Sequence, residues 1–311
     1  MVRIVRYCQE LHQDWNDFIQ TSKNGFFLFD RDYMEYHSDR FVDHSLLFFK
    51  NDELLAVLPA NETNGIFYSH GGLTYGGFIT NKRTSVVFIL EAFDVLILYL
   101  KEKGFSSFIY KIVPFIYHCL PAQEDLYALF RINASLCRRD ASSVIDLSQM
   151  PLYTKGTKSN LSKARKAGLL VKESSNFSVF FDIAIEILKT KYNTKPTHTA
   201  QEMSLLASRF PENIKLYFIY KEDLCLGGTI AFITELVFHT QYIAISDLGK
   251  ETGALDFLTD YLIQMNKSKR KYFSFGISTE QQGQYLNEGL IRNKESFGAR
   301  TITNDFYQIS I

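Results

Sequence analysis

Apolar residues recur along the first half of the chain with spacings that predict alternating helices and strands. Asn51-Asp52 lies between two apolar runs and predicts the turn of a β-hairpin. The expected elements of this half are a strand over Val2–Tyr7, helices over Leu11–Ser22 and Asp30–His37, hairpin strands over Ser45–Lys50 and Glu53–Pro59, apolar runs over Ile66–Ser69 and Leu73–Thr80, a helix over Arg83–Lys103 capped by Gly104, a strand over Phe105–Val113, a helix over Asp125–Ile132 and a strand over Ser135–Leu147.

The second half repeats this order of elements. Its hairpin turn is expected at Glu222-Asp223. The expected elements are helices over Phe177–Tyr192 and Ala200–Arg209 joined by the loop Asn193–Thr199, hairpin strands over Ile214–Lys221 and Cys225–Thr234, a strand over Leu236–Ser246, a helix over Gly253–Lys267, and strands over Tyr272–Phe275 and Thr301–Ile311. The pattern predicts two copies of one α/β unit, with domains at 1–150 and 151–311.

Composition excludes several classes of protein. The 311 residues include 34 basic and 34 acidic side chains, so no field of the whole protein attracts nucleic acid or an anionic membrane. The four cysteines are far apart in sequence, which favours neither a zinc site nor a disulfide framework. The N-terminus lacks the apolar core of a signal peptide, and the apolar run Ser85–Leu100 is interrupted by Glu91 and Asp94. We expect a cytoplasmic protein without a membrane span or a metal site.

A polar segment follows the strand expected at Tyr272–Phe275. Ser278, Glu280 and Asn287 lie in it, and a turn bearing Lys294 comes next. In open α/β sheets, ligands bind beyond the carboxyl ends of strands. We therefore expect the working site here, although Lys294 could equally be a surface lysine that caps a turn.

A glycine-rich stretch, Ser69–Phe78, is the second candidate region. Glycines at this density indicate bulges or a backbone that another group approaches closely. His70 is a candidate proton acceptor, and Tyr75 is a candidate wall of an acceptor site. A hydrogen-bonded core histidine and a packed tyrosine are the alternatives.

A basic helix is expected at Lys158–Gly168. Five cations fall within twelve residues here, with no acidic residue among them: Lys155 before the helix, and Lys158, Lys163, Arg165 and Lys166 within it. Such a run is either a solvated face or a patch that contacts phosphate.

The order of these elements, with particular residues, resembles the Fem-type peptidyltransferases, a group with two tandem GNAT-like (Gcn5-related acyltransferase-like) domains. The resemblance covers nearly the whole chain. It is carried by Asp14-Trp15 with Phe18, Asp30–Phe41, Leu54–Ala60, Ser69–Phe78, Lys158–Gly168, Leu226–Phe232, Phe275–Glu280 and Asn287–Arg300. It implies an α/β (α+β) fold of two GNAT-like domains, each a mixed, mostly antiparallel sheet flanked by helices.

The resemblance also implies transfer of an acyl or aminoacyl group to an amine. Lys294–Phe297 matches the family's lysine-bearing turn, although Asn293 stands where the family usually has Phe. Lys158 and Asn160 match a region that some relatives use for the phosphates of the acceptor, and Lys163 lies in the same helix. Some relatives that use charged tRNA carry a long helical arm. No heptad run follows Ala200, so aminoacyl-tRNA is the less favoured donor.

Acyl-coenzyme A is the other donor class. Its pyrophosphate is normally held by a glycine loop at a helix N-terminus. Gly249 and Gly253 are the candidates here, but Leu255 departs from the motif and Glu251 would repel phosphate. A capped helix start is the alternative, and we expect no tightly bound cofactor.

The expected mechanism is direct attack by the acceptor amine on the donor carbonyl. Lys294 would stabilise the oxyanion, and Glu280 or His70 would accept the proton. The acceptor would be a small molecule, a sugar-nucleotide or a peptide, as in cell-envelope or sugar-nucleotide metabolism. The alternative is a non-catalytic module of the same fold that binds a sugar-nucleotide or peptide. The sequence does not determine the oligomeric state.

Overall fold

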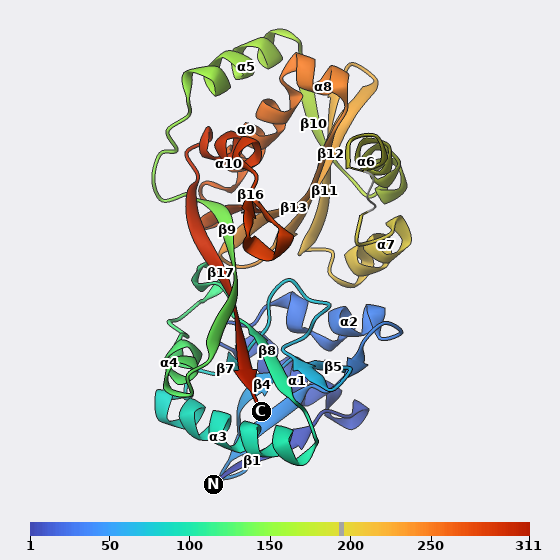
Figure 1. Cartoon of the computed structure of the whole chain (residues 1–311). Coiled ribbons are helices and arrows are strands. Elements are labelled where there is room, and N and C mark those ends of the chain that lie inside the picture. Colours follow the sequence, from blue (N-terminus) through green and yellow to red (C-terminus); the bar gives the residue numbers. More distant parts are fainter. Residues whose placement is uncertain (193–195) are drawn as a thin grey trace. The chain divides into compact units, whose positions relative to one another are not determined.

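The computed structural model describes residues 1–192 and 196–311, so the start of the expected loop Asn193–Thr199 lies outside the described residues. The chain forms two compact units (Figure 1). Unit 1 comprises Met1–Asp140, Gln281–Gln284 and Thr303–Ile311, and unit 2 comprises Ala141–Glu280 and Tyr285–Ile302. The expected single boundary after residue 150 differs from this division, because the chain passes between the units within the long strands β9 (Ser135–Asp146) and β17 (Arg300–Ser310) and on either side of Gln281–Gln284.

Unit 1 is a mixed α/β unit with two groups of strands. Its sheets have the orders β1-β3-β4-β7 and β9-β17-β8-β6-β5-β2. The strands are β1 (Val2–Arg6), β2 (Val42–Asp43), β3 (Leu46–Lys50), β4 (Glu53–Leu58), β5 (Asn61–Thr63), β6 (Ile66–Tyr68), β7 (Ile79–Thr80) and β8 (Ser107–Lys111). The helices are α1 (His12–Thr21), α2 (Arg31–Met34), α3 (Val86–Glu102) and α4 (Glu124–Arg131).

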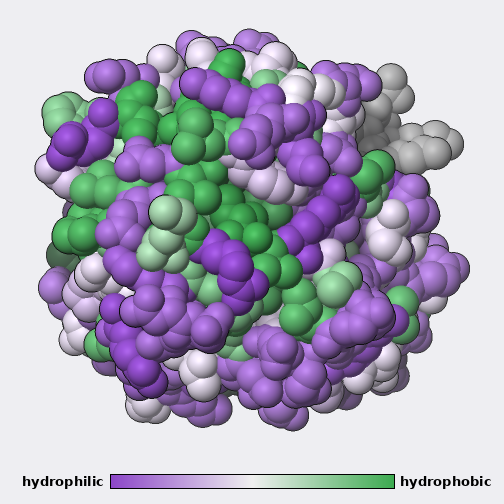
Figure 2. Space-filling view, turned by 90° about the horizontal axis from the view of Figure 1, so that it is seen from below, coloured by the Kyte–Doolittle hydropathy of each residue, from purple (hydrophilic) through white to green (hydrophobic). Residues whose placement is uncertain are grey.

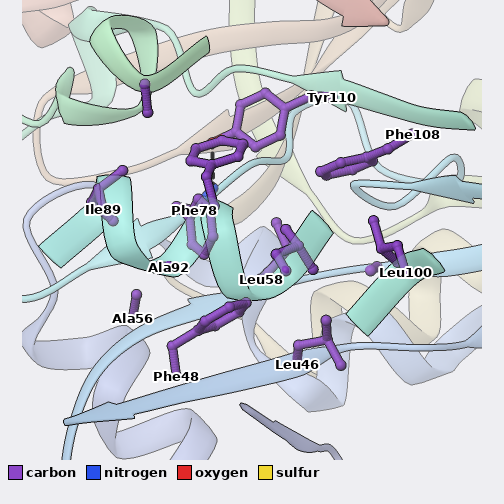
Figure 3. Close-up of a cluster of buried hydrophobic side chains, with 14 of the residues drawn as sticks. Leu46, Phe48, Ala56, Leu58, Phe78, Ile89, Ala92, Leu100, Phe108 and Tyr110 are labelled. Atoms are coloured by element: carbon purple, nitrogen blue, oxygen red, sulfur yellow. Dashed lines mark hydrogen bonds between the residues drawn. The ribbon is translucent and has the colours of Figure 1, made fainter. Parts of the chain in front are cut away.

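The hairpin of unit 1 forms for a local reason. Asn51 and Asp52 both have positive φ, at 50° and 60°, as a two-residue hairpin turn with matching strand twist requires. In the hydrophobic core of unit 1, helix α3 packs against both groups of strands. Figure 3 shows Ile89 and Ala92 of α3 close to Phe78, which lies between Phe48 and Tyr110.

Unit 2 contains the elements expected from the sequence in the expected order, with additional short elements among them. Its strands are β10 (Leu169–Ser174), β11 (Ile214–Lys221), β12 (Leu224–Ile233), β13 (Val237–Ile245), β14 (Tyr272–Ile277), β15 (Thr279–Glu280) and β16 (Tyr285–Leu286). Its helices are α5 (Lys155–Lys166), α6 (Phe177–Tyr192), α7 (Ala200–Arg209), α8 (Asp247–Thr252), α9 (Ala254–Asn266) and α10 (Glu288–Glu295). The main sheet has the order β10-β11-β12-β13-β14-β9, with α6 and α7 on one face and α9 and α10 on the other (Figure 1).

The fold class expected from the sequence is confirmed: each unit is a mixed, mostly antiparallel sheet flanked by helices. Several local expectations were wrong. The lysine-bearing turn is helix α10, and the run Leu73–Thr80 is a loop that becomes a strand only at Ile79–Thr80. Strand β10 and helix α8 were not expected. Tertiary packing determines whether such short elements form, because the local sequence patterns that would predict them are weak.

Two surface properties complete the description. Apolar residues gather over the middle of the face drawn in Figure 2, enclosed by polar ones. Unit 1 also exposes large apolar side chains on α3 and α4, among them Leu98 and Phe130. Among the described residues, no helix is long and apolar enough to cross a membrane.

Candidate functional site

Two parallel strands of unit 2 separate at the position where the site lies. β13 and β14 pair at Val237–Tyr272, Phe238–Phe273 and His239–Ser274. Among the described residues, no further pair joins the two strands. β13 also contains a bulge at Gln241, since Ile230 of β12 pairs with Tyr242 while Ala231 pairs with Thr240. Bulges often lie beside active sites. The end of β13 beyond His239 is therefore not paired with β14 within the described residues.

A pocket of about 660 Å³ opens where these strands part. A volume of this size is typical of small-molecule sites. Its walls come from β13, β14, α6, α8, α9 and α10, and most of the lining side chains are apolar. The lining residues are Phe180, Ala184, Ile187, Pro196, Thr197, Tyr242, Ile243, Ala244, Ile245, Lys250, Leu255, Thr259, Phe275, Leu290, Asn293 and Lys294.

Helix α10 brings Lys294 to the pocket. The Asn287 side chain caps the helix by accepting a hydrogen bond from the Leu290 N–H at 3.0 Å. Ile291 and Lys294 lie three residues apart and are the buried residues of α10, so one helical face turns inward. Lys294 is 6% exposed.

The Lys294 ammonium is held by backbone carbonyls. Nζ donates to the carbonyl oxygens of Gly276 at 3.0 Å and Ile277 at 2.6 Å. Burial lowers the pKa of Lys294 to about 8. The group is therefore mostly charged at neutral pH and can lose its proton in mild alkali, and one of the three N–H donors of an ammonium remains for a ligand.

A neutral histidine lies beside this lysine. His239 Nδ1 is 3.0 Å from Ser274 Oγ, and a Cβ on Gly276 would come within 3.1 Å of the His239 ring. Burial, followed by the charge of Lys294, lowers the pKa of His239 to about 4. His239 is therefore an uncharged imidazole at neutral pH.

Two serine hydroxyls near β14 are buried without a hydrogen-bond partner among the described residues. Ser278 Oγ and Ser143 Oγ both have this property. Ser143 pairs with Gly276 across the β9–β14 ladder, and the Ser278 N–H donates to Ala141. Directly opposed residues of an antiparallel pair share a face, so the two hydroxyls lie on the same face of the sheet. Unsatisfied buried hydroxyls indicate a place for a ligand or a water.

Tyr242 places a phenol at the pocket wall. Its hydroxyl lies 2.6 Å from His198 Nδ1, and its ring meets the ring of Phe181 edge to face. Burial raises the pKa of Tyr242, so the hydroxyl keeps its proton at neutral pH. A protonated phenol is a hydrogen-bond donor, so Tyr242 is a candidate donor at the pocket wall.

The structure places the other candidates of the polar segment near α10 but away from the pocket wall. Glu280 is exposed, and its Oε1 accepts a hydrogen bond from Asn287 Nδ2 at 2.9 Å. Asn287 is the N-cap of α10. Neither is among the side chains that line the pocket, so Asn287 positions Lys294 through the helix.

His70 and Tyr75 belong to unit 1, whereas Lys294 and its pocket belong to unit 2. His70 is buried and stacks on His37 at 5.3 Å between ring centroids. Burial lowers the pKa of His70 well below its ordinary value, and its Nδ1 has no hydrogen-bond partner among the described residues. Tyr75 is buried, with its hydroxyl 3.4 Å from that of Tyr117, and burial raises its pKa to about 12.

The two lysines and two glycines expected to meet anionic groups lie outside the pocket lining. Lys158 and Lys163 are exposed on α5. Gly249 is buried within α8, and Gly253 ends that helix with a left-handed φ of 77°. The expected pyrophosphate loop is thus a helical turn: the Gly249 N–H donates to Ser246 Oγ and the Gly253 N–H to the Lys250 carbonyl. The N–H groups of these two glycines are therefore already hydrogen-bonded within the chain.

Sequence reasoning missed Tyr242, His198 and His239. Tyr242 and His198 are 44 residues apart, and His239 and Ser274 are 35 apart, so no local motif connects them. The only signal in the sequence for these residues was that Tyr242 and His239 lie on an expected strand that is followed by a helix. Within the part of the chain that the structure describes, no group of three or more His, Cys, Asp or Glu residues could hold a metal ion.

Comparison with solved structures identifies the fold. No protein-family model and no curated protein matches the sequence. The structure is similar to FemX, with a TM-score of 0.68, 9% identity, and coverage of 99% of this chain and 97% of FemX. It is similar to the C-terminal domain of a protein designated lysylphosphatidylglycerol synthetase from Agrobacterium fabrum, with a TM-score of 0.61, 12% identity, and coverage of 97% and 92%.

A tandem GNAT protein from the clavulanic acid biosynthesis pathway aligns with a TM-score of 0.51, at 9% identity, over 100% of this chain and 98% of its own. The expected tandem GNAT-like fold of the Fem type is therefore confirmed. At these identities the likeness concerns the fold, and the chemistry must be argued from the site.

Proposed function

We propose that unit 2 transfers an acyl or aminoacyl group from a carrier to an amine by direct attack. One observation carries the proposal: a pocket opens between the separated strands β13 and β14, with the buried ammonium of Lys294 at its wall. Acyl transfer needs a place for the donor and hydrogen-bond donors where the oxyanion develops. The fold shared with FemX and with a tandem GNAT protein supports this class of reaction.

The pocket lining favours an apolar, uncharged acyl group. Phe180, Leu255, Phe275 and Leu290 contribute apolar surface. No carboxylate is among the described lining residues, and the charged ones are Lys250 and Lys294. Because burying an unpaired cation is costly, a donor with a positively charged side chain fits poorly. We therefore infer a medium-chain acyl group or an apolar aminoacyl group.

In the transfer step, the acceptor nitrogen forms a C–N bond to the donor carbonyl carbon. The remaining N–H of Lys294 stabilises the oxyanion. The carbon–sulfur or carbon–oxygen bond to the carrier then breaks. The Tyr242 hydroxyl gives its proton to the leaving group and is reprotonated through His198, while the amine proton passes to water.

Two carrier classes remain for experiment: a thioester of coenzyme A and an ester of tRNA. The occupied N–H groups of Gly249 and Gly253 argue against a pyrophosphate held in the usual GNAT manner. Lys250 lines the pocket, but its Nζ is already paired with Asp247 at 2.8 Å. A thioester would therefore be held mainly through its acyl chain.

The proposal is tested with hydroxylamine as a small amine acceptor. Octanoyl-coenzyme A, acetyl-coenzyme A, phenylalanyl-tRNA and lysyl-tRNA serve as donors, and formation of the hydroxamate is measured. We expect octanoyl-coenzyme A or phenylalanyl-tRNA to be used, with acetyl-coenzyme A and lysyl-tRNA poorer within each class. Lys294→Met should lose the activity. Lys250→Met, the matched control from the same pocket, should keep most of it.

Thermal unfolding distinguishes a transferase from the alternative non-catalytic module. A ligand at 100 times its dissociation constant adds about 2.7 kcal/mol to the free energy of unfolding. Stabilisation by a sugar-nucleotide or peptide, with no hydroxamate from any donor, would support the binding module and contradict the transferase.

A further inference from the structure

Helix α5 presents a row of lysines to solvent. Lys155, Lys158, Ser162 and Lys166 are spaced three or four residues apart and lie along one exposed face, with Lys163 beside them. The opposite face is buried through Thr157, Leu161 and Ala164. The helix contains no acidic residue, and within the described residues these four lysines form no ion pair. Arg165 differs, because it pairs with Asp260 at 3.3 Å.

Two of the most exposed large apolar side chains of the chain precede this helix. Leu152 is 78% exposed and Met150 is 75% exposed. Lys267 Nζ is 3.3 Å from Met150 Sδ, and Lys155 comes three residues after Leu152. A cation therefore stands beside Met150, and Lys155 begins the basic helix that follows Leu152.

The loop that bears them is held in place. The Thr154 N–H donates to the Ser296 carbonyl at 3.0 Å, and the Tyr153 hydroxyl donates to Asp260 at 2.9 Å. A Cβ on Gly298 would lie 2.8 Å from the Leu152 nitrogen, so the backbone of Leu152 packs directly against Gly298. The Leu152 side chain is thus kept in solvent by a fixed backbone.

We propose that this basic–apolar surface, formed by Met150, Leu152, Lys155, Lys158, Lys163, Lys166 and Lys267, binds the surface of a membrane that contains anionic lipids. Lysines near such a surface are attracted to lipid phosphates, while exposed apolar side chains enter the boundary between headgroups and acyl chains. The net charge of the whole chain is zero, so the attraction must come from this local patch.

A nucleic-acid phosphate backbone would account for the lysines alone. It would leave Leu152 and Met150 exposed without a role, whereas a bilayer gives a reason for both kinds of side chain. Membrane binding is independent of the proposed transfer reaction, since none of these residues lines the pocket.

The test is flotation of the full chain with vesicles. Vesicles of phosphatidylcholine alone are compared with vesicles of phosphatidylcholine and phosphatidylglycerol in equal parts. We expect binding only to the anionic vesicles, weakened by salt. Replacing Lys155, Lys158, Lys163 and Lys166 together by Gln should lower the partition coefficient by about a hundredfold or more. Leu152→Gln should lower it roughly tenfold.

Two control variants make single changes of the same two kinds elsewhere on the chain. Lys101→Gln alters an exposed lysine of α3, and Phe130→Gln alters an apolar side chain of α4 that is 76% exposed. Both should float like the wild type. The proposal is overturned if the wild type does not float with anionic vesicles, or if Leu152→Gln floats as well as the wild type. RNA binding that depends on the lysines but is unaffected by Leu152→Gln, without flotation, would assign the surface to nucleic acid.

Discussion

Strands β6 and β8 of unit 1 run parallel, as β13 and β14 do in unit 2, and each pair is joined through a long helix, α3 or α9. In unit 1 the space beyond the paired segment holds the glycine-rich loop. A Cβ on Gly76 would lie 2.0 Å from the Ser69 carbonyl oxygen, and one on Gly77 would lie 2.6 Å from that of Lys111. In unit 2 the corresponding space is the pocket.

Each unit also buries a lysine that backbone carbonyls hold. Lys111 Nζ in unit 1 donates to the carbonyls of His70, Gly71 and Leu73. Lys294 Nζ in unit 2 donates to those of Gly276 and Ile277. Three acceptors use all the donors of Lys111, whereas Lys294 keeps one and lines the pocket. The same arrangement of strands is thus closed in unit 1, where the lysine holds a loop by hydrogen bonds. It is open in unit 2, where the lysine can contact a ligand.

The largest expected effect is a difference in turnover between variants of Lys294 and Lys111. Lys294→Met should lower the turnover number about 10²–10³-fold, the loss typical of removing one oxyanion donor. Lys111→Met should leave turnover within about twofold but destabilise unit 1, because buried carbonyls lose their donor. Steady-state kinetics with the best donor and urea unfolding measure the two effects. Equal losses of turnover would show that the lysines do not differ in this way.

The glycine-rich loop can be tested by adding a single methyl group. Gly77→Ala should cost about 3 kcal/mol of unfolding free energy, since a left-handed φ and a backbone clash act together. The φ of Gly77 is 83°, and its Cβ would meet the Lys111 carbonyl and the Tyr110 hydroxyl. Gly65→Ala is the matched control: its φ is 74°, but open space surrounds it.

Gly65→Ala should therefore cost only about 1 kcal/mol, from the left-handed backbone alone. Urea denaturation of both variants gives the comparison. If the two substitutions lower the free energy of unfolding equally, the glycine-rich loop is not packed as closely around Gly77 as described.

The pocket phenol is expected to contribute less than Lys294. Tyr242→Phe should lower turnover by about 10- to 100-fold, because water can replace a general acid in part. The effect should be larger for donors with a poor leaving group. His198→Ala combined with Tyr242→Phe should lose little more than Tyr242→Phe alone, since the two side chains act as a pair. Additive losses would contradict the pairing.

The smallest effect is a difference in pH dependence between the units. Burial, followed by the charge of Arg138, lowers the pKa of Lys111 from 10.5 to about 7, and burial lowers that of Lys294 from 10.5 to about 8. Between the folded pKa and 10.5 the unfolded chain binds more protons than the folded one. The free energy of unfolding therefore rises with pH in that window, with a limiting slope of about 1.4 kcal/mol per pH unit for each group.

Between pH 7 and 8 the contribution of Lys111 should dominate. The stability of the wild type relative to Lys111→Met should increase by about 1 kcal/mol over this interval, while that relative to Lys294→Met changes less until pH 8 is passed. Unfolding of the three proteins at pH 7, 8 and 9 gives these differences. Loss of the Lys294 charge should also reduce turnover above about pH 8. Coincident pH profiles for both variants would contradict the distinction.

The amino-acid sequence by itself determined the order of the longer elements in both halves. Hairpin turns such as Asn51-Asp52, the helical spacing of α3 with its stop at Gly104, and the basic helix α5 depend on neighbours a few residues away. Local steric and hydrogen-bonding preferences act at that range, so these features are visible in the chain. Lys294 could be chosen as well, because it follows a strand end rich in polar residues.

Only the tertiary structure decided which strand pair is open. Whether Gly77 packs against Lys111, whether Tyr242 meets His198, and where β9 and β17 leave one unit for the other depend on residues tens of positions apart. Their free energies come from packing and burial that no local pattern encodes. Lys111 shows this most clearly. In the sequence it is the last residue of a strand, and only the folded loop around it makes it a buried ammonium with three carbonyl acceptors.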